Sequence, residues 1–210
     1  MKSGSLLFLF AVWLSAQASA AEFKDGRVTR VIKDVQLLPE QAASRPAAVN
    51  DEVRGGTAVR TGADSRSELK FSDLTIARLG SNTIFSLNEG ARTIDLDAGA
   101  VLLRVPKGSG GATIKTAAVT AAITGTTVMA EYHPNVFKFI MLEGTAKITR
   151  PGHPGESVTL QTGEMLSGDP NKPLEQPVTV DLERVTESSL LLRDFGRLGS
   201  EDLIEQGKKE

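Results

Sequence analysis

The 210-residue chain contains no cysteine and only two histidines, His133 and His153. Without cysteine, the fold must be held by its core and by hydrogen bonds between strands rather than by disulfides. Each histidine directly precedes a proline in an expected turn, and no Gly-x-Ser-x-Gly turn is present to supply a serine nucleophile. We therefore predict that the protein is not an enzyme and uses no metal or cofactor.

Aromatic residues and basic clusters are also scarce. Aromatic residues make up 5% of the chain, with a single tryptophan, Trp13, and a single tyrosine, Tyr132. This argues against a carbohydrate-binding module built on exposed rings. The 24 Lys and Arg residues form no block and face 26 Asp and Glu residues, so the charge pattern of a nucleic-acid-binding protein is missing. We expect no nucleic-acid partner.

Two patterns could suggest chemistry, and each has a simpler interpretation. Asp95 and Asp97 stand two apart on one expected strand, and paired carboxylates there could serve a glycosidase or bind calcium. The polar face of an outer strand explains them more simply. The glycines at residues 108–111 lack the Gly-Lys-Ser/Thr ending of a phosphate-binding loop, so a tight hairpin is the simpler interpretation.

The first 20 residues have the pattern of a secretory signal peptide. Lys2 provides the positive start, residues 6–16 are apolar, and residues 18–20 fit a cleavage site after Ala20. The apolar run is shorter than the roughly 20 residues that span a bilayer, although a buried helix or a membrane anchor is the alternative. We expect a mature protein that is periplasmic or secreted and not inserted in a membrane.

Short β-type segments separated by turn residues continue from about residue 26 to residue 167. Strand starts recur about every 8–12 residues, which is typical of all-β folds. We expect an all-β fold, either a twisted β-solenoid or an open sandwich, since the pattern alone does not separate them. The expected strands are 27–31, 58–61, 67–71, 74–79, 83–87, 92–96, 100–105, 112–116, 119–124, 127–132, 136–142, 145–149, 157–160 and 164–166. The expected buried residues are Leu69, Phe71, Ile76, Leu79, Leu87, Ile94, Leu96, Leu103, Val119, Ile123, Val128, Ile140 and Ile148.

Composition divides the chain into four parts. After the signal peptide (1–20) and the β domain (21–167), the proline-rich residues 168–178 are expected to form an extended linker. Residues 179–210 are expected to form a helical tail, with Leu182, Val185 and Leu192 at helical spacing. That amphipathic tail could dock in a groove of a partner protein or pack across its own β domain.

Several segments, taken in order over residues 26–167, resemble the FecR domain. They are 51–53, 58–71 and 72–83, followed by 94–101, 114–116, 123–128, 136–148 and 158–164. We expect the family-motif positions to be structural rather than catalytic, with Gly125 and Thr126 in a bend and Glu143 and Gly144 in a hairpin. These positions are Thr61, Gly62, Asp64, Asp73, Leu79, Gly80, Gly99, Gly125, Thr126, Glu143, Gly144, Gly163 and Glu164.

The resemblance implies a role in the cell envelope. The family's best-known members are envelope-spanning regulators, in which a cytoplasmic segment controls a sigma factor and a periplasmic FecR domain receives a signal from an outer-membrane transporter. We expect this chain to lack the cytoplasmic arm and the membrane helix, and its 43 residues after Ser167 are too few for the small α/β domain that follows in those regulators. The leading hypothesis is therefore a non-enzymatic protein that binds another envelope protein. The alternative is a structural envelope protein that binds peptidoglycan or polysaccharide.

Overall fold

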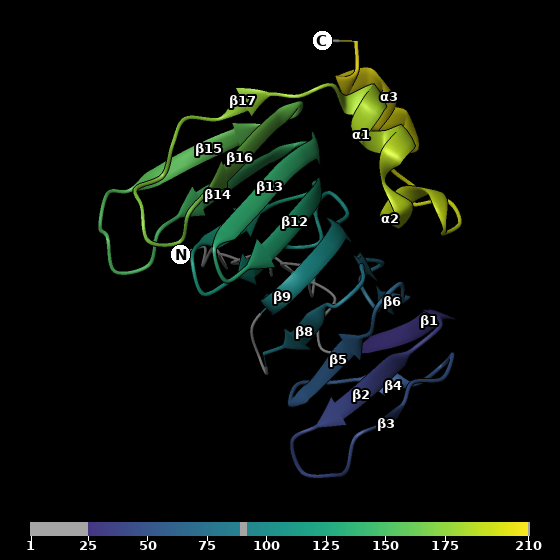
Figure 1. Cartoon of the computed structure of the whole chain (residues 1–210). Helices are drawn as coiled ribbons and strands as arrows, with labels where there is room; N and C mark the ends of the chain where they lie inside the picture. Colours follow the sequence, from purple (N-terminus) through teal and green to yellow (C-terminus); the bar gives the residue numbers. More distant parts are fainter. Residues whose placement is uncertain (1–24, 89–91, 210) are drawn as a thin grey trace, which may run out of the picture.

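The computed structural model describes residues 25–88 and 92–209, and it is rich in β-strands with a helical tail (Figure 1). The structure confirms the expected strand-rich fold with helices at the C-terminal end. The predicted signal peptide and its cleavage position Ala20 lie outside the described residues. Among the described helices, none combines the length and the apolar character needed to cross a membrane.

The strands form two layers that share one long strand. Layer A runs in spatial order through β4 (Glu52–Val53), β1 (Gly26–Ile32), β6 (Arg66–Phe71), β7 (Ile76–Leu79), β9 (Thr93–Arg104), β12 (Thr127–His133), β13 (Val136–Glu143), β16 (Glu164–Gly168) and β17 (Val178–Thr179). Layer B runs through β3 (Arg45–Pro46), β2 (Val35–Pro39), β5 (Thr57–Thr61), β8 (Ile84–Leu87), β9, β10 (Ala112–Lys115), β11 (Thr120–Ile123), β14 (Thr145–Thr149) and β15 (Ser157–Gln161).

Strand β9 connects the two layers. Its first half pairs with β8 and β10 in layer B, and its second half, from Gly99 onward, pairs with β7 and β12 in layer A. The sequence predicted two strands here, 92–96 and 100–105, and that division is wrong. Gly99 has a φ of +87° and redirects the chain between layers without ending the strand.

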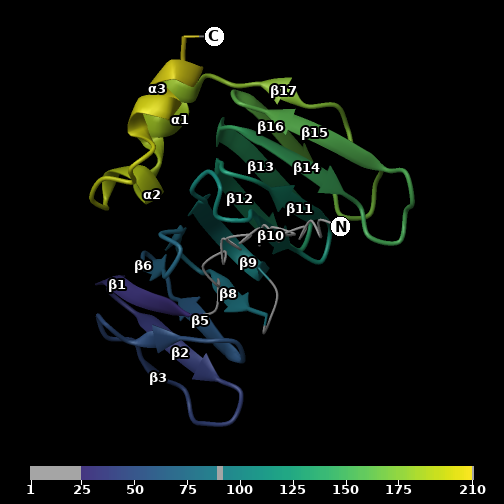
Figure 2. The same cartoon turned by 180° about the vertical axis from the view of Figure 1, so that it is seen from behind.

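The strands stack along one axis. Strands β2 to β4 lie at one end and β15 to β17 at the other, and the view from behind shows β10, β11 and β14 of layer B (Figures 1 and 2). The sheet is open, because the short strands β3, β4 and β17 and the five-residue β15 end the layers. All neighbouring strands pair antiparallel except β9 and β10, which are parallel.

A large apolar core fills the space between the layers. It gathers the inward side chains of both layers, such as Leu69 from β6 and Phe85 from β8, each with no exposed surface. All of the predicted core residues are buried except Ile76, which is half-buried on the opposite face of layer A. Ile140 is also on that opposite face, where the tail buries it, so alternation predicted the main core with two errors of phase, at Ile76 and Ile140.

The error at Ile76 comes from the turn between β6 and β7. The sequence predicted a strand from residue 74, but the turn extends through Thr75 and β7 begins at Ile76. Leu74 lies in the turn with a φ of +67° and is 55% exposed. The inward residues of β7 are therefore Ala77 and Leu79, not Leu74 and Ile76.

Four short strands were not predicted: β2, β3, β4 and β17. The segment around residues 39–46 is a turn that leads into β3. Pro46 lies in this edge strand, opposite Gln36 of β2. An edge position tolerates proline because one side of the strand needs no donor.

The tail folds onto the outer face of layer A. It contains α1 (Leu182–Ser188), α2 (Leu190–Arg193) and α3 (Glu201–Gly207), so the helical spacing of Leu182, Val185 and Leu192 spans two helices that are interrupted at Ser189. A second apolar cluster joins tail and sheet, and it consists of Leu102, Ile140, Leu142, Leu182, Leu191, Phe195, Leu198 and Ile204. Of the two placements considered for the tail, the structure has the one on its own β domain.

Candidate functional site

Most of the family-motif positions lie where the chain passes between the layers. The N-terminal half crosses along one edge, at residues 33–34, 62–65, 80–83 and 98–100, which we call the first crossing edge. The C-terminal half crosses along the opposite edge, at residues 124–126, 144 and 162–163, which we call the second crossing edge. Motif residues thus gather on two edges of the fold.

Threonine side chains connect successive crossings on the first crossing edge. The Thr61 hydroxyl donates to the Gly80 carbonyl oxygen and accepts the Thr83 N–H at 2.9 Å. The Thr83 hydroxyl in turn accepts the Ala100 N–H at 3.0 Å and lies 3.1 Å from the Ala100 carbonyl oxygen. Both threonines are buried, so these hydrogen bonds satisfy main-chain groups that water does not reach.

Gly62 and Asp64 occupy the neighbouring turn. The Gly62 N–H donates to the Asp34 carbonyl oxygen at 2.9 Å, and a Cβ on Gly62 would lie 2.8 Å from the Asp34 carboxylate. Asp64 has a φ of +50°, and its exposed carboxylate lies 3.6 Å from the Lys33 amine. Both contacts are to the adjacent crossing of the same fold.

On the second crossing edge, successive crossings are also in contact, and glycines occupy the bends. Gly125 and Gly144 both have positive φ, and a Cβ on Gly144 would lie 2.6 Å from the Thr126 methyl group. The Gly144 N–H donates to the Thr162 hydroxyl at 2.9 Å. The bend and the hairpin expected from the sequence lie here, side by side.

Further motif residues close turns or fill the core. The Gly163 N–H donates to the Met141 carbonyl oxygen, and the Glu164 carboxylate accepts the Gln161 N–H at 2.7 Å. Leu79 lies in the main core with no exposed surface. Their contacts are all internal to the fold.

Asp73 organises the turn before β7. Its buried carboxylate accepts the main-chain N–H and the hydroxyl of Thr75, each at 2.9 Å, and forms an ion pair with Arg92. Because Arg92 also donates to the Gly111 carbonyl oxygen, Asp73 ties this turn to the loop before β10.

Glu143 and its neighbours connect the second crossing edge to the tail. Glu143 is buried, with one carboxylate oxygen 3.4 Å from the Thr127 hydroxyl and the other 3.4 Å from the Lys107 amine. The Thr127 hydroxyl donates to the Ser200 hydroxyl at 2.9 Å. Glu143 is therefore linked to Ser200 of the tail through one residue, Thr127.

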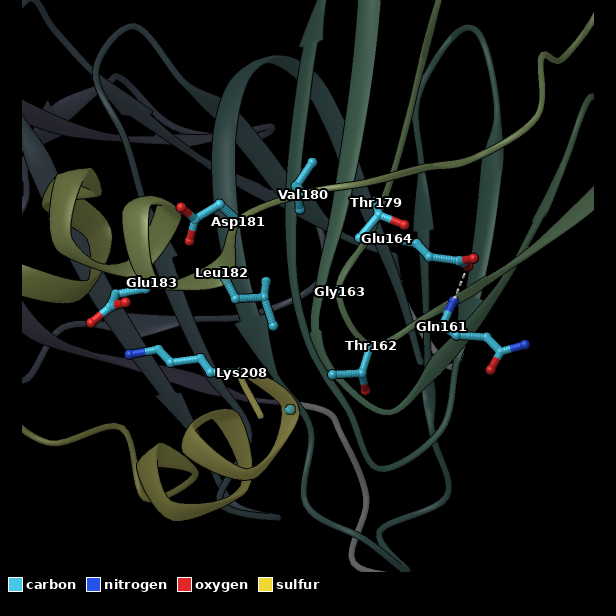
Figure 3. A pocket seen from close by; sticks show the side chains of 11 residues that line it. Gln161, Thr162, Gly163, Glu164, Thr179, Val180, Asp181, Leu182, Glu183 and Lys208 are labelled. Carbon is cyan, nitrogen blue, oxygen red and sulfur yellow. Dashed lines mark hydrogen bonds between the residues drawn. The ribbon is translucent and has the colours of Figure 1, made fainter. Parts of the chain in front are cut away.

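A pocket of about 480 Å³ lies between the second crossing edge and the tail (Figure 3). Two of its acidic side chains accept main-chain N–H groups: Glu164 from Gln161, and Asp181, at the start of α1, from Arg184. The carboxylates of Glu164 and Glu183 point to opposite sides (Figure 3). Glu164 and Glu183 therefore do not form a converging pair for acid–base chemistry, and Asp181 is engaged in capping α1.

The sequence candidates for chemistry are likewise dispersed. Each histidine is half-exposed beside a glutamate, with His133 3.2 Å from Glu131 and His153 3.9 Å from Glu156. The Asp95 carboxylate accepts the Asn88 side-chain N–H at 2.6 Å. Within residues 25–88 and 92–209, no three His, Asp or Glu side chains gather as metal ligands.

The most developed recognition geometry is the contact between layer A and the tail. Arg78 of β7 is 1% exposed and lies under α2. Its guanidinium donates to the Glu68 carboxylate at 2.8 Å, to the Leu191 carbonyl oxygen at 3.1 Å and to the Gly196 carbonyl oxygen at 2.5 Å. It also lies 5.0 Å from the centre of the Phe195 ring, within cation–π range.

Three more arginines on this face contact the same segment. Arg66 forms an ion pair with Asp194 at 2.7 Å, and Arg104 donates to the Gly199 carbonyl oxygen at 3.3 Å. The Arg30 guanidinium lies 5.8 Å from the centre of the Phe195 ring. We call Arg30, Arg66, Arg78 and Arg104 the arginine clamp. The arginine clamp was not predicted from the sequence; its one local signal was Arg104, which follows the predicted core residue Leu103 and so faces outward.

The loop before α3 is held by a carboxylate with a shifted pKa. Burial alone would raise the pKa of Glu201, but hydrogen bonds from its own N–H and from those of Leu198 and Gly199 outweigh burial and lower the pKa. Such a carboxylate stabilises the folded state above its unfolded pKa, and this contribution is lost as the pH falls through the lowered folded value.

We therefore expect acid to loosen α3 in the native protein. Glu201→Gln should weaken α3 at neutral pH, and its difference from the native protein should shrink as the pH falls below the ordinary glutamate pKa of about 4.3. NMR signals of the α3 amides measure this. Glu205→Gln, on an exposed position of the same helix, is the control. A constant difference at all pH values would contradict the assignment.

Comparison with known proteins agrees with the pattern of motif positions. Residues 57–147 match the model of the FecR protein family. The chain contains a FecR domain. The matched segment runs from β5 into β14 and is shorter than the 26–167 expected from the motifs. It includes Arg66, Arg78 and Arg104 of the clamp, whereas the tail lies outside it.

Two crystal structures resemble this FecR-domain protein in fold. Both are of a candidate anti-sigma factor from Parabacteroides distasonis ATCC 8503, at 1.65 Å and 2.50 Å resolution. Each matches with a TM-score of 0.53 and 12% sequence identity, over 61% of this chain and 62% of that chain. At this identity the likeness shows a shared fold. No curated protein sequence matches the chain.

Proposed function

We propose that this protein acts by binding another protein, as a periplasmic or secreted FecR-domain protein in envelope signalling or sensing. The observation that carries the proposal is the contact between layer A and residues 182–204. There the FecR domain holds a protein segment through an apolar cluster and through arginines that donate to main-chain carbonyl oxygens. The domain thus presents a surface suited to protein segments.

The comparisons support regulation over a structural role. The FecR family match and the fold shared with a candidate anti-sigma factor both point toward signalling proteins. The dispersed histidines and carboxylates of the described residues support a non-enzymatic mode of action. For the architecture we favour the solenoid-like form implied by the family resemblance, since the strands stack along one axis (Figure 1).

Affinity capture tests this function. The protein comprising residues 21–210 is crosslinked mildly in envelope extract, captured, and its partners are identified by mass spectrometry, with beads lacking the protein as the control. Recovery of an outer-membrane transporter or an anchored regulator supports the proposal. Recovery of glycan or wall fragments alone supports the structural alternative, and recovery of nothing above background removes support for a binding role.

A further inference from the structure

The tail is attached to the FecR domain in a way that permits release. Residues 169–177 contain no helix or strand, and only the two-residue strand β17, paired with β16, lies between them and the tail helices. The three tail helices have seven, four and seven residues. Isolated helices shorter than about 12–15 residues are marginal in water, so these helices depend on the sheet for their order. The tail therefore behaves as a short peptide tethered to its binding face.

The binding face recognises features that other segments share. Two of the hydrogen bonds made by Arg78 go to main-chain carbonyl oxygens, which any peptide provides. Selectivity must come from the apolar side chains that meet Leu102, Ile140 and Leu142, and from an acidic group that pairs with Arg66, as Asp194 does. Four clamp arginines against Glu68 give this face a positive charge that favours an acidic partner segment.

Release of the tail does not leave a buried charge unpaired. Arg78 is buried because the tail covers it, with its carbonyl partners in residues 191 and 196. When the tail leaves, the guanidinium regains water, which replaces the lost hydrogen bonds at a small net cost, and Glu68 remains its partner. Opening is therefore opposed mainly by exposure of the second apolar cluster, which is far smaller than the main core.

We propose that the outer face of layer A is a binding site for a helical segment of a partner protein that carries leucine or phenylalanine anchors and an acidic residue. In the structure, residues 182–204 of the same chain occupy this site, and a partner segment can replace them. The inference rests on the proposed function and specifies its binding face. The partner segment binds by displacing the tail, so the tail sets a threshold for partner affinity.

A nicked form of the whole chain tests this exchange. A protease recognition sequence is inserted between Glu175 and Gln176, which leaves the anchored Leu174 on the β domain. After cleavage, a fluorescent peptide of residues 176–210 is added and its binding is followed by anisotropy. We expect saturable binding as the labelled peptide replaces the resident tail. A labelled peptide that never exchanges into folded, nicked protein would overturn the proposal.

Arg78→Ala provides the specificity test. In the nicked protein it should weaken peptide binding at least tenfold, which corresponds to about 1.4 kcal/mol. The control, Arg60→Ala, removes an exposed arginine of β5 in layer B and should leave binding unchanged. Amide protection in β12 and β13 shows whether each variant keeps its sheet. Equal binding by both variants, with the sheet intact, would contradict the assigned face.

The outcome separates this inference from the proposed function. Exchange of the tail without any captured envelope protein would leave the site established and the signalling role unsupported. A captured partner that binds the intact and the Arg78→Ala proteins equally would support the function and overturn the assigned face.

Discussion

Replacing Gly99 with alanine is expected to lower the free energy of unfolding by about 3–5 kcal/mol, among the larger effects of single substitutions. Gly99 has a φ of +87°, and its added Cβ would lie 2.5 Å from Thr83 Cα and 2.8 Å from the Asn82 carbonyl oxygen. These are main-chain atoms, and Thr83 is held in place because its N–H donates to the Thr61 hydroxyl and its own hydroxyl accepts the Ala100 N–H. The clash therefore cannot be relieved by turning one side chain.

A clash at Gly99 would affect both layers of the fold and not only the local turn. Strand β9 is the one described strand that pairs in both layers, and Gly99 marks its passage between them. A displaced Gly99 would shift the pairing with β7 and β12 together.

Gly152→Ala is the matched control, since Gly152 has a φ of +76° and no atom within 4 Å of an added Cβ. It should cost only the backbone penalty of about 1–2 kcal/mol. Urea unfolding of the two variants measures both values. Equal losses would show that backbone conformation, not crowding at Thr83, determines the effect.

The strands that could be predicted from the sequence are those with strict alternation between clear turns. Thr145–Thr149 and Val136–Glu143, joined at Gly144, were predicted nearly to the residue. Alternation assigns each side chain to a face, and a shift of one residue would bury the polar face. The same rule failed at Leu74 because a turn lengthened by a residue with positive φ changes the phase.

The binding face could not be predicted, because its parts are far apart in the sequence. The hydrogen bond from Arg78 to the Leu191 carbonyl oxygen joins residues 113 positions apart. The predicted phase of strand 74–79 put Ile76, and with it Arg78, on the core face, so the sequence did not show that Arg78 faces the tail. The motif positions were easier to predict from the sequence, because glycine and threonine at turns are favoured by the local backbone geometry alone.

Two phenylalanines should separate the stability of the sheet from the docking of the tail. Phe139 lies in the main core with no exposed surface, 6.5 Å from the Phe137 ring centre. Phe139→Ala should lower the free energy of unfolding by about 3–5 kcal/mol, since it removes a fully buried ring from a packed core. Loss of protection should then extend to amides of both layers.

Phe195→Ala should act on the tail alone. Phe195 belongs to the second apolar cluster and lies against Arg78 and Arg30, so its loss removes an anchor and both cation–π contacts. Hydrogen exchange should speed up for the amides of Val185 and Ile204, while β12 and β13 keep their protection. If Phe195→Ala instead lowers protection throughout layer A, tail and sheet form one cooperative unit. A partner could then reach the clamp only by unfolding the domain, and exchange of the tail would be ruled out as its mode of binding.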